Sequence, residues 1–270
     1  MPQTGTGRFG VVGLGRMAHA LLSALIEAGL IEPGDVRAAV ASEASARRLV
    51  AEHGLAVGTD STPAWACSTV LLAIKPQQLE AVAASAPPPG EGAAPLLISV
   101  LAGVRLEKLQ RLFPGRRIVR AVPNTPALVG AGLTALAFAP EVDGPERQWV
   151  SALFARVGEV LELPEGQLDA FLALTSSGPA FVALIAEAMA DGAVAAGLPR
   201  PLAQHLAHRT LAGTAELLHQ RELHPGQLKD MVASPAGTTV AGLRRLEAAG
   251  VRSALLEAVL AAAERSRELG

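Results

Sequence analysis

The sequence predicts an α/β protein in which a doubly wound, mostly parallel sheet is followed by an all-helical domain. Short apolar runs alternate with helical stretches in the first 164 residues, as expected when crossover helices join parallel strands. From about Glu165 the strand signals stop, and alanine-rich helical sequence runs to Gly270. We therefore expect two domains, residues 1–164 and 165–270.

The expected strands are short and almost wholly apolar, as strands covered on both faces are. Glycine and proline punctuate the helical half at Gly178-Pro179, Gly197 to Pro199, His224 to Gly226 and Ser234-Pro235. The expected strands are Phe9–Val12, Val36–Ala41, Val70–Ile74, Leu96–Val100 and Ile118–Val122, with helices at His19–Ala28, Ala44–His53 and Leu106–Leu112.

Composition excludes several classes of protein. The chain of 270 residues is 50% apolar, and its net charge of -2 does not favour nucleic acid or an anionic membrane as a partner. The lone Cys67 makes neither an intramolecular disulfide nor a cysteine metal site. The first residues lack an apolar signal-peptide core, and Ser-Ser-Gly-Pro interrupts the uncharged tract Ala170–Ala186. We expect a cytoplasmic protein with no membrane span.

A glycine motif, Gly13-x-Gly15-x-x-Ala18, directly follows the first strand and opens the first helix. Such a turn brings the backbone close to a pyrophosphate, whose charge the free N–H groups of the helix start hold. The βαβ context predicts a Rossmann-like dinucleotide site with contacts from Gly13, Gly15, Arg16 and Met17.

The end of the second strand bears on which dinucleotide is used. An acid there contacts the ribose hydroxyls of NAD, whereas basic and hydroxyl groups favour the 2'-phosphate of NADP. Ser42 and the arginines Arg47 and Arg48 suit a phosphate, whereas Glu43 opposes it. Alternatively, all four residues form a solvent-exposed helix start with no role in cofactor binding. We expect NADP(H) to be preferred, with NAD(H) left open.

Three further turns follow strands at the carboxyl edge of the predicted sheet, where ligands bind in open α/β folds. Ala73, Lys75 and Pro76 close the third strand, and a lysine there suits phosphate or nicotinamide. Ala102 and Asn124 follow the next two strands. We expect all five residues to line the cofactor crevice.

Two segments of the helical half stand out, residues 175–180 and the helix break at residues 231–243. With the glycine motif they give the chain a resemblance to the pyrroline-5-carboxylate reductase family that runs in order from Phe9 nearly to the C-terminus. The pieces that carry it are GLGRMA (13–18), LLAIKPQ (71–77), ISVLAGV (98–104), RAVPNTPALVGAG (120–132), LTSSGPAF (174–181), DGAVAAGLPR (191–200) and HPGQLKDMVASPAGTTVAGLRRLE (224–247).

The resemblance implies NAD(P)H-dependent reduction of the cyclic imine Δ1-pyrroline-5-carboxylate to L-proline, the last step of proline biosynthesis. It further implies that the helical half forms an intertwined homodimer, that dimers assemble to a decamer, and that the substrate pocket is completed across the dimer. The chain departs from the family at Ser176 and Ala236, where glycine is common, and at Met231, where asparagine is common near the nicotinamide.

The break at Ser234 to Thr239 supplies what hydride transfer to a C=N bond requires of the protein. Backbone N–H groups of Gly237, Thr238 and Thr239 at a helix start suit the substrate carboxylate, and Ser234 adds a hydroxyl. Thr239 falls on the family's active-site threonine and is expected to hydrogen-bond the ring nitrogen. Ser177 is expected to border the same pocket.

Other interpretations stay open. Ser-Pro and Thr-Thr are also ordinary helix starts that need no function. A β-hydroxyacid dehydrogenase would carry a lysine one turn after Gly178, where this chain has Val182. A non-catalytic dinucleotide sensor would have no use for the hydroxyl of Thr239. His205 and His208 lack an obvious third ligand, so we expect no metal site.

Overall fold

The computed structural model describes residues 8–90 and 94–269, which form two compact units. The first unit runs to Ser176 and also includes the C-terminal residues from Ala262 onward. The second unit is Ser177–Ala261. The boundary expected near residue 164 falls inside the first unit. The reason is that the helix after it packs against a strand of the sheet.

Within the described residues, the first unit contains one eight-stranded sheet in the order β3-β2-β1-β4-β5-β6-β7-β8. All neighbours are parallel except β6 and β7, which are antiparallel, so the expected doubly wound sheet is confirmed. The strands are β1 (Phe9–Val12), β2 (Val36–Ala39), β3 (Ala56–Gly58), β4 (Thr69–Leu72), β5 (Leu96–Ser99), β6 (Arg117–Pro123), β7 (Gly132–Phe138) and β8 (Gly158–Glu162).

Three of these strands, β3, β7 and β8, were missed by the sequence analysis. β3 has only three residues, and β8 has two exposed glutamates and no buried residue, so neither forms a buried apolar run. The pair β7–β8 begins where Gly132 faces Gly158. A Cβ at Gly158 would lie 1.9 Å from the carbonyl oxygen of Gly132, so this strand pairing depends on the glycine.

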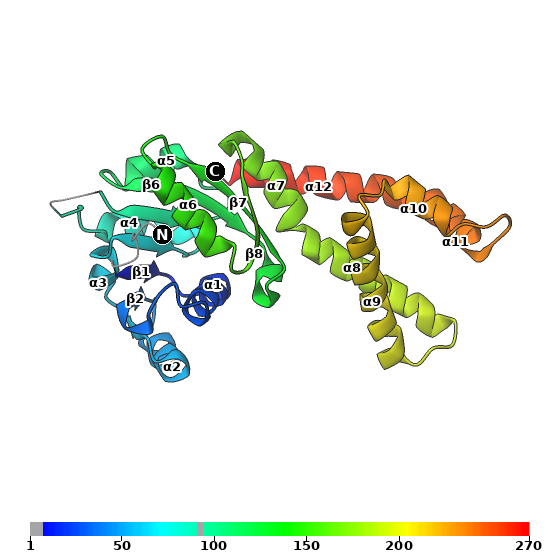
Figure 1. Ribbon diagram of the computed structural model, residues 1–270, viewed down its shortest axis with the longest axis horizontal. Helices are drawn as coiled ribbons and strands as arrows, with labels where there is room; N and C mark the ends of the chain where they lie inside the picture. The colour runs from blue at the N-terminus through cyan, green and yellow to red at the C-terminus, as the bar shows by residue number, and fades with distance from the viewer. Residues whose placement is uncertain (1–7, 91–93, 270) are drawn as a thin grey trace. The chain divides into compact units, whose positions relative to one another are not determined.

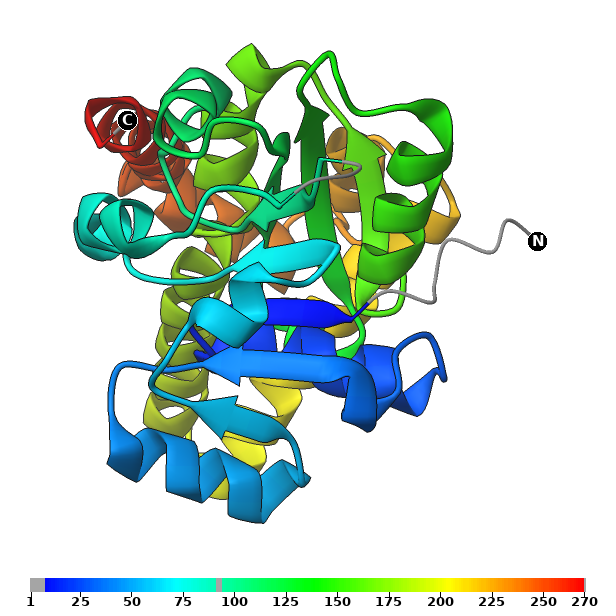
Figure 2. The same ribbon diagram turned by 90° about the vertical axis from the view of Figure 1, so that its left-hand side faces the viewer.

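Helices cover both faces of the sheet (Figure 1). In the side view of Figure 2, α4 and α5 lie on one face and α1 and α6 on the other. The helices and 3-10 turns of this unit are α1 (Arg16–Glu27), η1 (Pro33–Asp35), α2 (Glu43–His53), α3 (Thr62–Trp65), η2 (Pro76–Gln78), α4 (Leu79–Ser85), α5 (Leu106–Leu112), η3 (Thr125–Val129), α6 (Gly144–Phe154), η4 (Glu165–Gln167) and α7 (Leu168–Thr175).

The core of this unit lies between the sheet and its helices. Val11 of β1, Val70 of β4 and Leu97 of β5 are fully buried, as the continuous apolar strands predict. Leu25 of α1 and Leu109 of α5 are also fully buried and belong to the same cluster. The rigid sheet therefore fixes the positions of the turns that follow each strand.

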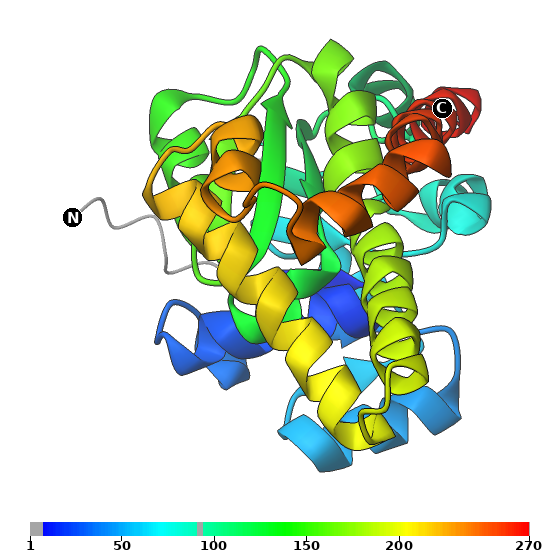
Figure 3. The ribbon, with the colours of Figure 1, turned by 90° about the vertical axis from the view of Figure 1, so that its right-hand side faces the viewer.

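The second unit is wholly helical in the residues that the structure describes. The long helices α8 and α9 pack against each other and bury Ala190, Ala203 and Ala207 between them (Figure 3). Small alanine side chains permit this close approach. The helices are α8 (Gly178–Ala195), α9 (Arg200–Gln220), α10 (Pro225–Met231), α11 (Thr238–Ala248) and α12 (Val251–Glu268), and the last begins in the second unit and ends in the first.

Candidate active site

A cleft of about 610 Å³ lies at the carboxyl edge of the sheet, over the ends of β1, β2 and β4. Backbone hydrogen bonds continue the pairing one residue beyond these strands, from Gly13 N to Ala39 O (2.9 Å) and from Ala73 N to Val12 O (2.8 Å). The three turns are therefore held together at one edge. Of the residues expected at the cofactor, Gly13, Gly15, Ala73 and Lys75 line this cleft.

The glycine turn has the shape that a dinucleotide requires. Gly13 has φ +89°, and a Cβ there would lie 2.7 Å from the carbonyl oxygen of Ala73. Gly15 caps α1 with no side-chain hydrogen bond, and a Cβ at Gly15 would have no heavy atom within 4 Å. The first amide to bond within the helix is that of His19, to Gly15 O at 2.9 Å.

The amides of Arg16, Met17 and Ala18 consequently have no acceptor within α1 and emerge at its N-terminus. A pyrophosphate at this position would receive backbone hydrogen bonds and the positive end of the helix dipole. The chain thus fits a dinucleotide. The side chain of Arg16 lies outside what the structure describes, and that of Met17 packs on the core.

The rim of the cleft beside β2 and β3 carries hydroxyl and guanidinium groups. Ser45, Arg48, Thr59 and Ser61 line it. Ser42 is not among the lining residues, because its Oγ caps α2 and accepts from the amide of Ser45 at 3.3 Å. No sequence pattern singles out Thr59 or Ser61, whereas the position of Ser45 one turn into a capped helix is a usable signal for a residue at this rim.

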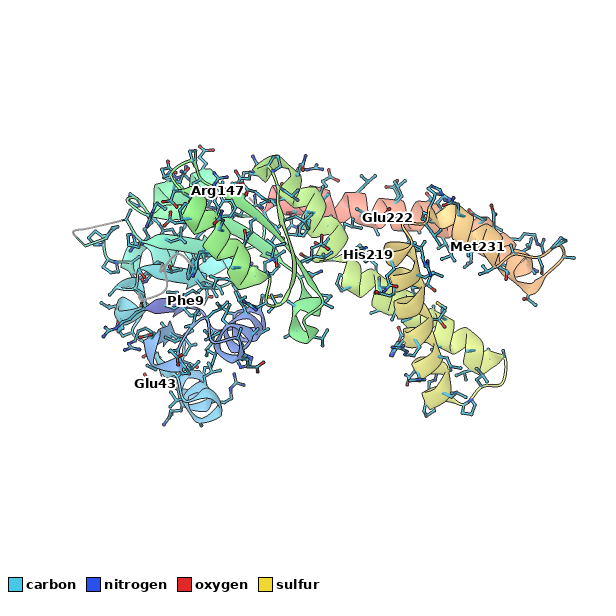
Figure 4. The ribbon with its side chains drawn as sticks, in the orientation of Figure 1. Phe9, Glu43, Arg147, His219, Glu222 and Met231 are labelled. Atoms are coloured by element: carbon cyan, nitrogen blue, oxygen red, sulfur yellow. The ribbon has the colours of Figure 1, made fainter. Side chains whose placement is uncertain are left out.

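Glu43, labelled in Figure 4 at the start of α2, is held by a neighbour at this rim. Thr59 Oγ1 donates to Glu43 Oε1 at 2.7 Å, so the carboxylate is held by the residue that follows β3, and Glu43 does not line the cleft. Nearby, hydrogen bonds from the amide and side chain of Thr62 hold the pKa of Asp60 below its ordinary value. The acids of this rim are therefore partnered, while the Arg48 side chain lines the cleft.

The remaining expected cofactor residues have other surroundings. Pro76 opens η2 beside Lys75 and is not a lining residue of the cleft. Ala102 is exposed in the turn after β5. The Asn124 side chain is 5% exposed and held in place, since Nδ2 donates to Thr175 O (3.0 Å) and Oδ1 accepts from Leu133 N (2.8 Å). These two bonds fix the orientation of the amide.

In the second unit, a tight turn separates α10 from α11, as the helix break at residues 231–243 predicts. The amide of Gly237 donates to Ser234 O at 2.9 Å. Pro235 is the second residue of this turn, and Ala236 is the third with φ +57°, a left-handed conformation that favours glycine. A Cβ at Gly237 would lie 2.3 Å from Ser234 Oγ and 3.0 Å from Ser234 O, so a side chain there would displace the Ser234 hydroxyl.

This turn corrects one expectation about the substrate site. The amide of Gly237 is not free, because it closes the turn onto Ser234. Helical bonding starts with Ala241 N to Gly237 O at 3.2 Å, and no side chain caps the helix. The uncapped amides at the start of α11 are therefore those of Thr238, Thr239 and Val240.

The hydroxyl of Thr239 has a defined direction. Its Oγ1 donates to Val232 O at 2.9 Å, which leaves the oxygen lone pairs as acceptors. Ser234 is exposed, and Met231 at the end of α10 (Figure 4) is 67% exposed. A hydroxyl acceptor, uncapped amides and an exposed apolar side chain thus lie within one short segment.

Two further expectations concern Ser177 and metals. Ser177 precedes α8 and is the first residue of the second unit, half-buried and without a side-chain cap bond. Across residues 8–90 and 94–269, no group of three or more His, Cys, Asp or Glu side chains is arranged to hold a metal ion.

The fold and the cleft define a dinucleotide-binding oxidoreductase with a helical second half. A family described as NADP oxidoreductase, coenzyme F420-dependent, matches residues 8–103, and one described as pyrroline-5-carboxylate reductase dimerisation matches residues 165–269. The chain uses a nicotinamide dinucleotide, NAD(P).

The chain belongs to the pyrroline-5-carboxylate reductase family. It is 48% identical to a pyrroline-5-carboxylate reductase of Synechocystis over 97% of this chain and 98% of that protein, and 39% identical to one of Methanosarcina acetivorans over 97% and 98%. A solved pyrroline-5-carboxylate reductase of Coxiella burnetii has a TM-score of 0.84 at 30% identity, with 98% of this chain and 99% of that one covered. A pyrroline carboxylate reductase of Plasmodium falciparum, solved with NADP bound, has a TM-score of 0.85 at 28% identity and the same coverage.

Proposed function

We propose that this protein is an NAD(P)H-dependent pyrroline-5-carboxylate reductase, which reduces Δ1-pyrroline-5-carboxylate to L-proline in the last step of proline biosynthesis. The observation that carries the proposal is the uncapped start of α11 with Thr239 beside it, in a chain that also has a dinucleotide cleft. The 48% identity to a pyrroline-5-carboxylate reductase over nearly the whole chain supports it.

The substrate carboxylate is held by the start of α11. The amides of Thr238 and Thr239 donate to its oxygens, and the positive end of the helix dipole favours the negative charge. Ser234, exposed and next to Gly237 in the same turn, adds a hydroxyl donor. Gly237 contributes by closing the turn, and Ser177 borders the pocket from the start of α8.

Thr239 acts on the ring nitrogen as a hydrogen-bond acceptor. Because its proton is directed to Val232 O, its oxygen offers lone pairs to the N–H of the protonated imine. This bond favours the protonated iminium over the neutral imine, and the iminium carbon is the better hydride acceptor. It also holds that carbon in a fixed orientation. The reduced nicotinamide supplies the hydride. The C=N π electrons then settle on nitrogen, which keeps its proton and becomes the amine of proline.

NADPH is the preferred reductant in this proposal, with NADH as a second substrate. Arg48 and Ser45 line the rim where a 2'-phosphate would lie, and Thr59 holds the Glu43 carboxylate aside. Gly13, Gly15, Arg16 and Met17 bind the pyrophosphate through the backbone of their turn. Along the same edge, Lys75, Pro76, Ala73, Ala102 and Asn124 extend the site toward the nicotinamide, and Ser42 contributes by capping α2.

We propose that the helical region 165–270, which includes parts of both compact units, binds the substrate and dimerises, and that dimers assemble to a decamer in the cytoplasm. Large apolar side chains are exposed along the helices, among them Leu184, Leu206, Leu256 and Leu260. The helical stretch Glu165–Ala195 is long and apolar enough to cross a membrane, with 17% of its most apolar window buried. Its place in the matched dimerisation region supports a protein partner, not lipid, as its covering.

The test is NADPH oxidation by the purified protein with and without pyrroline-5-carboxylate, with NADH run in parallel. Absence of substrate-dependent oxidation by a protein that binds NADPH would refute the proposal.

Thr239→Val should lower kcat about 10–100-fold, because a hydrogen bond to a charged group contributes about 1.5–3 kcal/mol. Thr214→Val, an exposed threonine on α9, is the matched control and should leave kcat unchanged. Equal rates for the two variants would remove Thr239 from this role.

A further inference from the structure

A buried polar network lies at the carboxyl end of β5 and the middle of β6. Arg120 of β6 is fully buried and pairs in register with Ser99, the last residue of β5. Its NH1 lies 3.2 Å from Glu165 Oε1, and its NH2 lies 3.6 Å from Asp169 Oδ1 on α7. Asp169 Oδ1 also accepts from Ser266 Oγ at 2.7 Å, and Ser266 is 3% exposed. The network therefore ties the last turns of α12 to the sheet.

The same end of α12 touches the turn after β5. Gly103 has φ +76°, and a Cβ there would lie 3.0 Å from Leu269 Cβ and 3.2 Å from Ser266 O. These contacts lie within the first unit, which includes the C-terminal residues from Ala262. Figures 1 and 3 show the red end of α12 next to α7. The C-terminal segment Ser266 to Leu269 thus packs directly on the backbone of Gly103.

The connection from β5 to α5 is held at both ends by this network and its neighbours. The amide of Leu106, the first residue of α5, donates to Glu165 Oε1 at 2.6 Å. The amide of Leu101 donates to Ser99 Oγ at 3.4 Å. Between them Gly103 meets Leu269, while Ala102 alone of residues 101–104 is exposed. The backbone around Ala102 is consequently fixed from three sides.

Stability alone does not account for this network. Burying charged groups costs several kcal/mol per ion unless their hydrogen bonds are complete. Here Arg120 Nε and NH2 make no hydrogen bond within the described part of the chain, and the NH2–Asp169 distance of 3.6 Å is long. Well-packed apolar side chains in place of these charged groups would stabilise the fold at least as well. The network therefore serves to hold the segments around it in position.

We propose that Asp169 and Ser266 are positioning residues for cofactor binding: they hold the C-terminal segment against Gly103 and so fix the turn of Ala102. The turn stands at the same sheet edge as Gly13 and Ala73, because Val100 N pairs with Leu72 O at 3.0 Å. A dinucleotide bound at the first strand extends along this edge toward the later strands, so its nicotinamide half reaches the turn. The inference rests on the proposed use of NAD(P)H.

The test compares Ser266→Ala with Ser253→Ala, which makes the same change at an exposed position of the same helix. We expect Ser266→Ala to raise the Kd for NADPH, measured by fluorescence titration, about fivefold, and to speed amide hydrogen exchange at Leu101 to Val104. Ser253→Ala should leave both unchanged. In turnover, KM for NADPH should rise with Ser266→Ala while KM for pyrroline-5-carboxylate stays the same, a split that a loss of stability does not produce.

A second pair of variants tests the contact itself. Gly103→Ala places a methyl group against Leu269, whereas Gly29→Ala has a similar φ of +65° and no heavy atom within 4 Å of the new Cβ. Gly103→Ala should raise the NADPH Kd more than Gly29→Ala does. The proposal is overturned if Ser266→Ala binds NADPH with the wild-type Kd. It is also overturned if Gly103→Ala and Gly29→Ala have equal Kd values for NADPH. Because Kd needs no turnover, these results decide it even if the protein fails to reduce pyrroline-5-carboxylate.

Discussion

Gly13 and Gly15 belong to one motif, yet the structure predicts opposite consequences for their replacement by alanine. Gly15 has φ −79° and ψ 179°, which any residue adopts, and a Cβ there meets no protein atom within 4 Å. Gly13 has φ +89°, and its Cβ would lie 2.7 Å from Ala73 O and 2.8 Å from the Ile74 side chain. The first change adds a methyl group at the cofactor cleft, and the second forces it into packed backbone.

The magnitudes follow from these surroundings. Gly15→Ala should leave the fold intact, because the gain of about 0.4–1 kcal/mol from lower entropy of the unfolded chain is offset by the poorer fit of alanine at a helix N-cap. The methyl group stands where a pyrophosphate must approach the backbone to about 2.9 Å, so NADPH Kd should rise at least about tenfold, or about 1.4 kcal/mol. Gly13→Ala should cost about 2–5 kcal/mol of folding free energy through left-handed strain and overpacking.

Fluorescence titration of NADPH measures the first effect, and urea unfolding followed by circular dichroism measures the second. The two assays should separate the variants, with Gly15→Ala stable but weak in cofactor binding and Gly13→Ala unstable. If Gly15→Ala binds NADPH with the wild-type Kd, the pyrophosphate does not lie at the start of α1. If Gly13→Ala unfolds at the wild-type urea concentration, the close contact with Ala73 is not a constraint on the fold.

Three further outcomes follow from particular contacts. Thr59→Val frees the Glu43 carboxylate, which would then repel the 2'-phosphate of NADPH at the cleft rim. The ratio of kcat/KM for NADPH to that for NADH should therefore fall about fivefold, whereas Glu43→Gln should raise this ratio. An unchanged ratio in both variants would contradict the role of this pair. Ala236→Gly relieves about 1–2 kcal/mol of left-handed strain in the folded protein, but the greater entropy of the unfolded chain lowers stability by about 0.4–1 kcal/mol. Urea unfolding should therefore show a net increase of about 0.5–1 kcal/mol in the free energy of unfolding. Burial raises the pKa of the Cys67 thiol above its ordinary 9.0, so the folded protein keeps this proton to a higher pH than the unfolded chain does. The contribution to stability is therefore full below pH 9 and declines as the pH rises above 9, and Cys67→Ala should lose less stability than the wild type in that range. Parallel curves of unfolding free energy against pH would show that the thiol does not titrate with unfolding.

Local sequence was sufficient for the features that depend on neighbours along the chain. The glycine turn, the first apolar strands and the break between α10 and α11 were all predicted, because periodicity and turn residues act within a few positions. Strand β3 was too short to register, and β8 exposes its glutamates at a sheet edge, so both needed their pairing partners to be recognised.

In the candidate site, too, local sequence indicates some features, whereas others depend on contacts between residues far apart in the chain. Sequence patterns place Ser42 at a helix start and Gly237 in a turn, and the structure adds their partners: Ser42 caps its own helix, and the Gly237 amide closes the turn onto Ser234. Thr59 was missed because its bond to Glu43 joins positions 16 residues apart. Sequence spacing locates a helix start or a turn, but it does not show which donors are already engaged.

The sequence by itself therefore determined the type of fold, the family and the short segments that we propose bind the cofactor and the substrate, because each is written in contiguous residues. Only the tertiary structure decided that α7 and the end of α12 pack with the sheet, and that Ser266, Asp169 and Arg120 meet although 97 residues separate the first two. The physical reason is that a buried ion pair or a glycine contact depends on which surfaces the folded sheet brings together. No local pattern of residues carries that information.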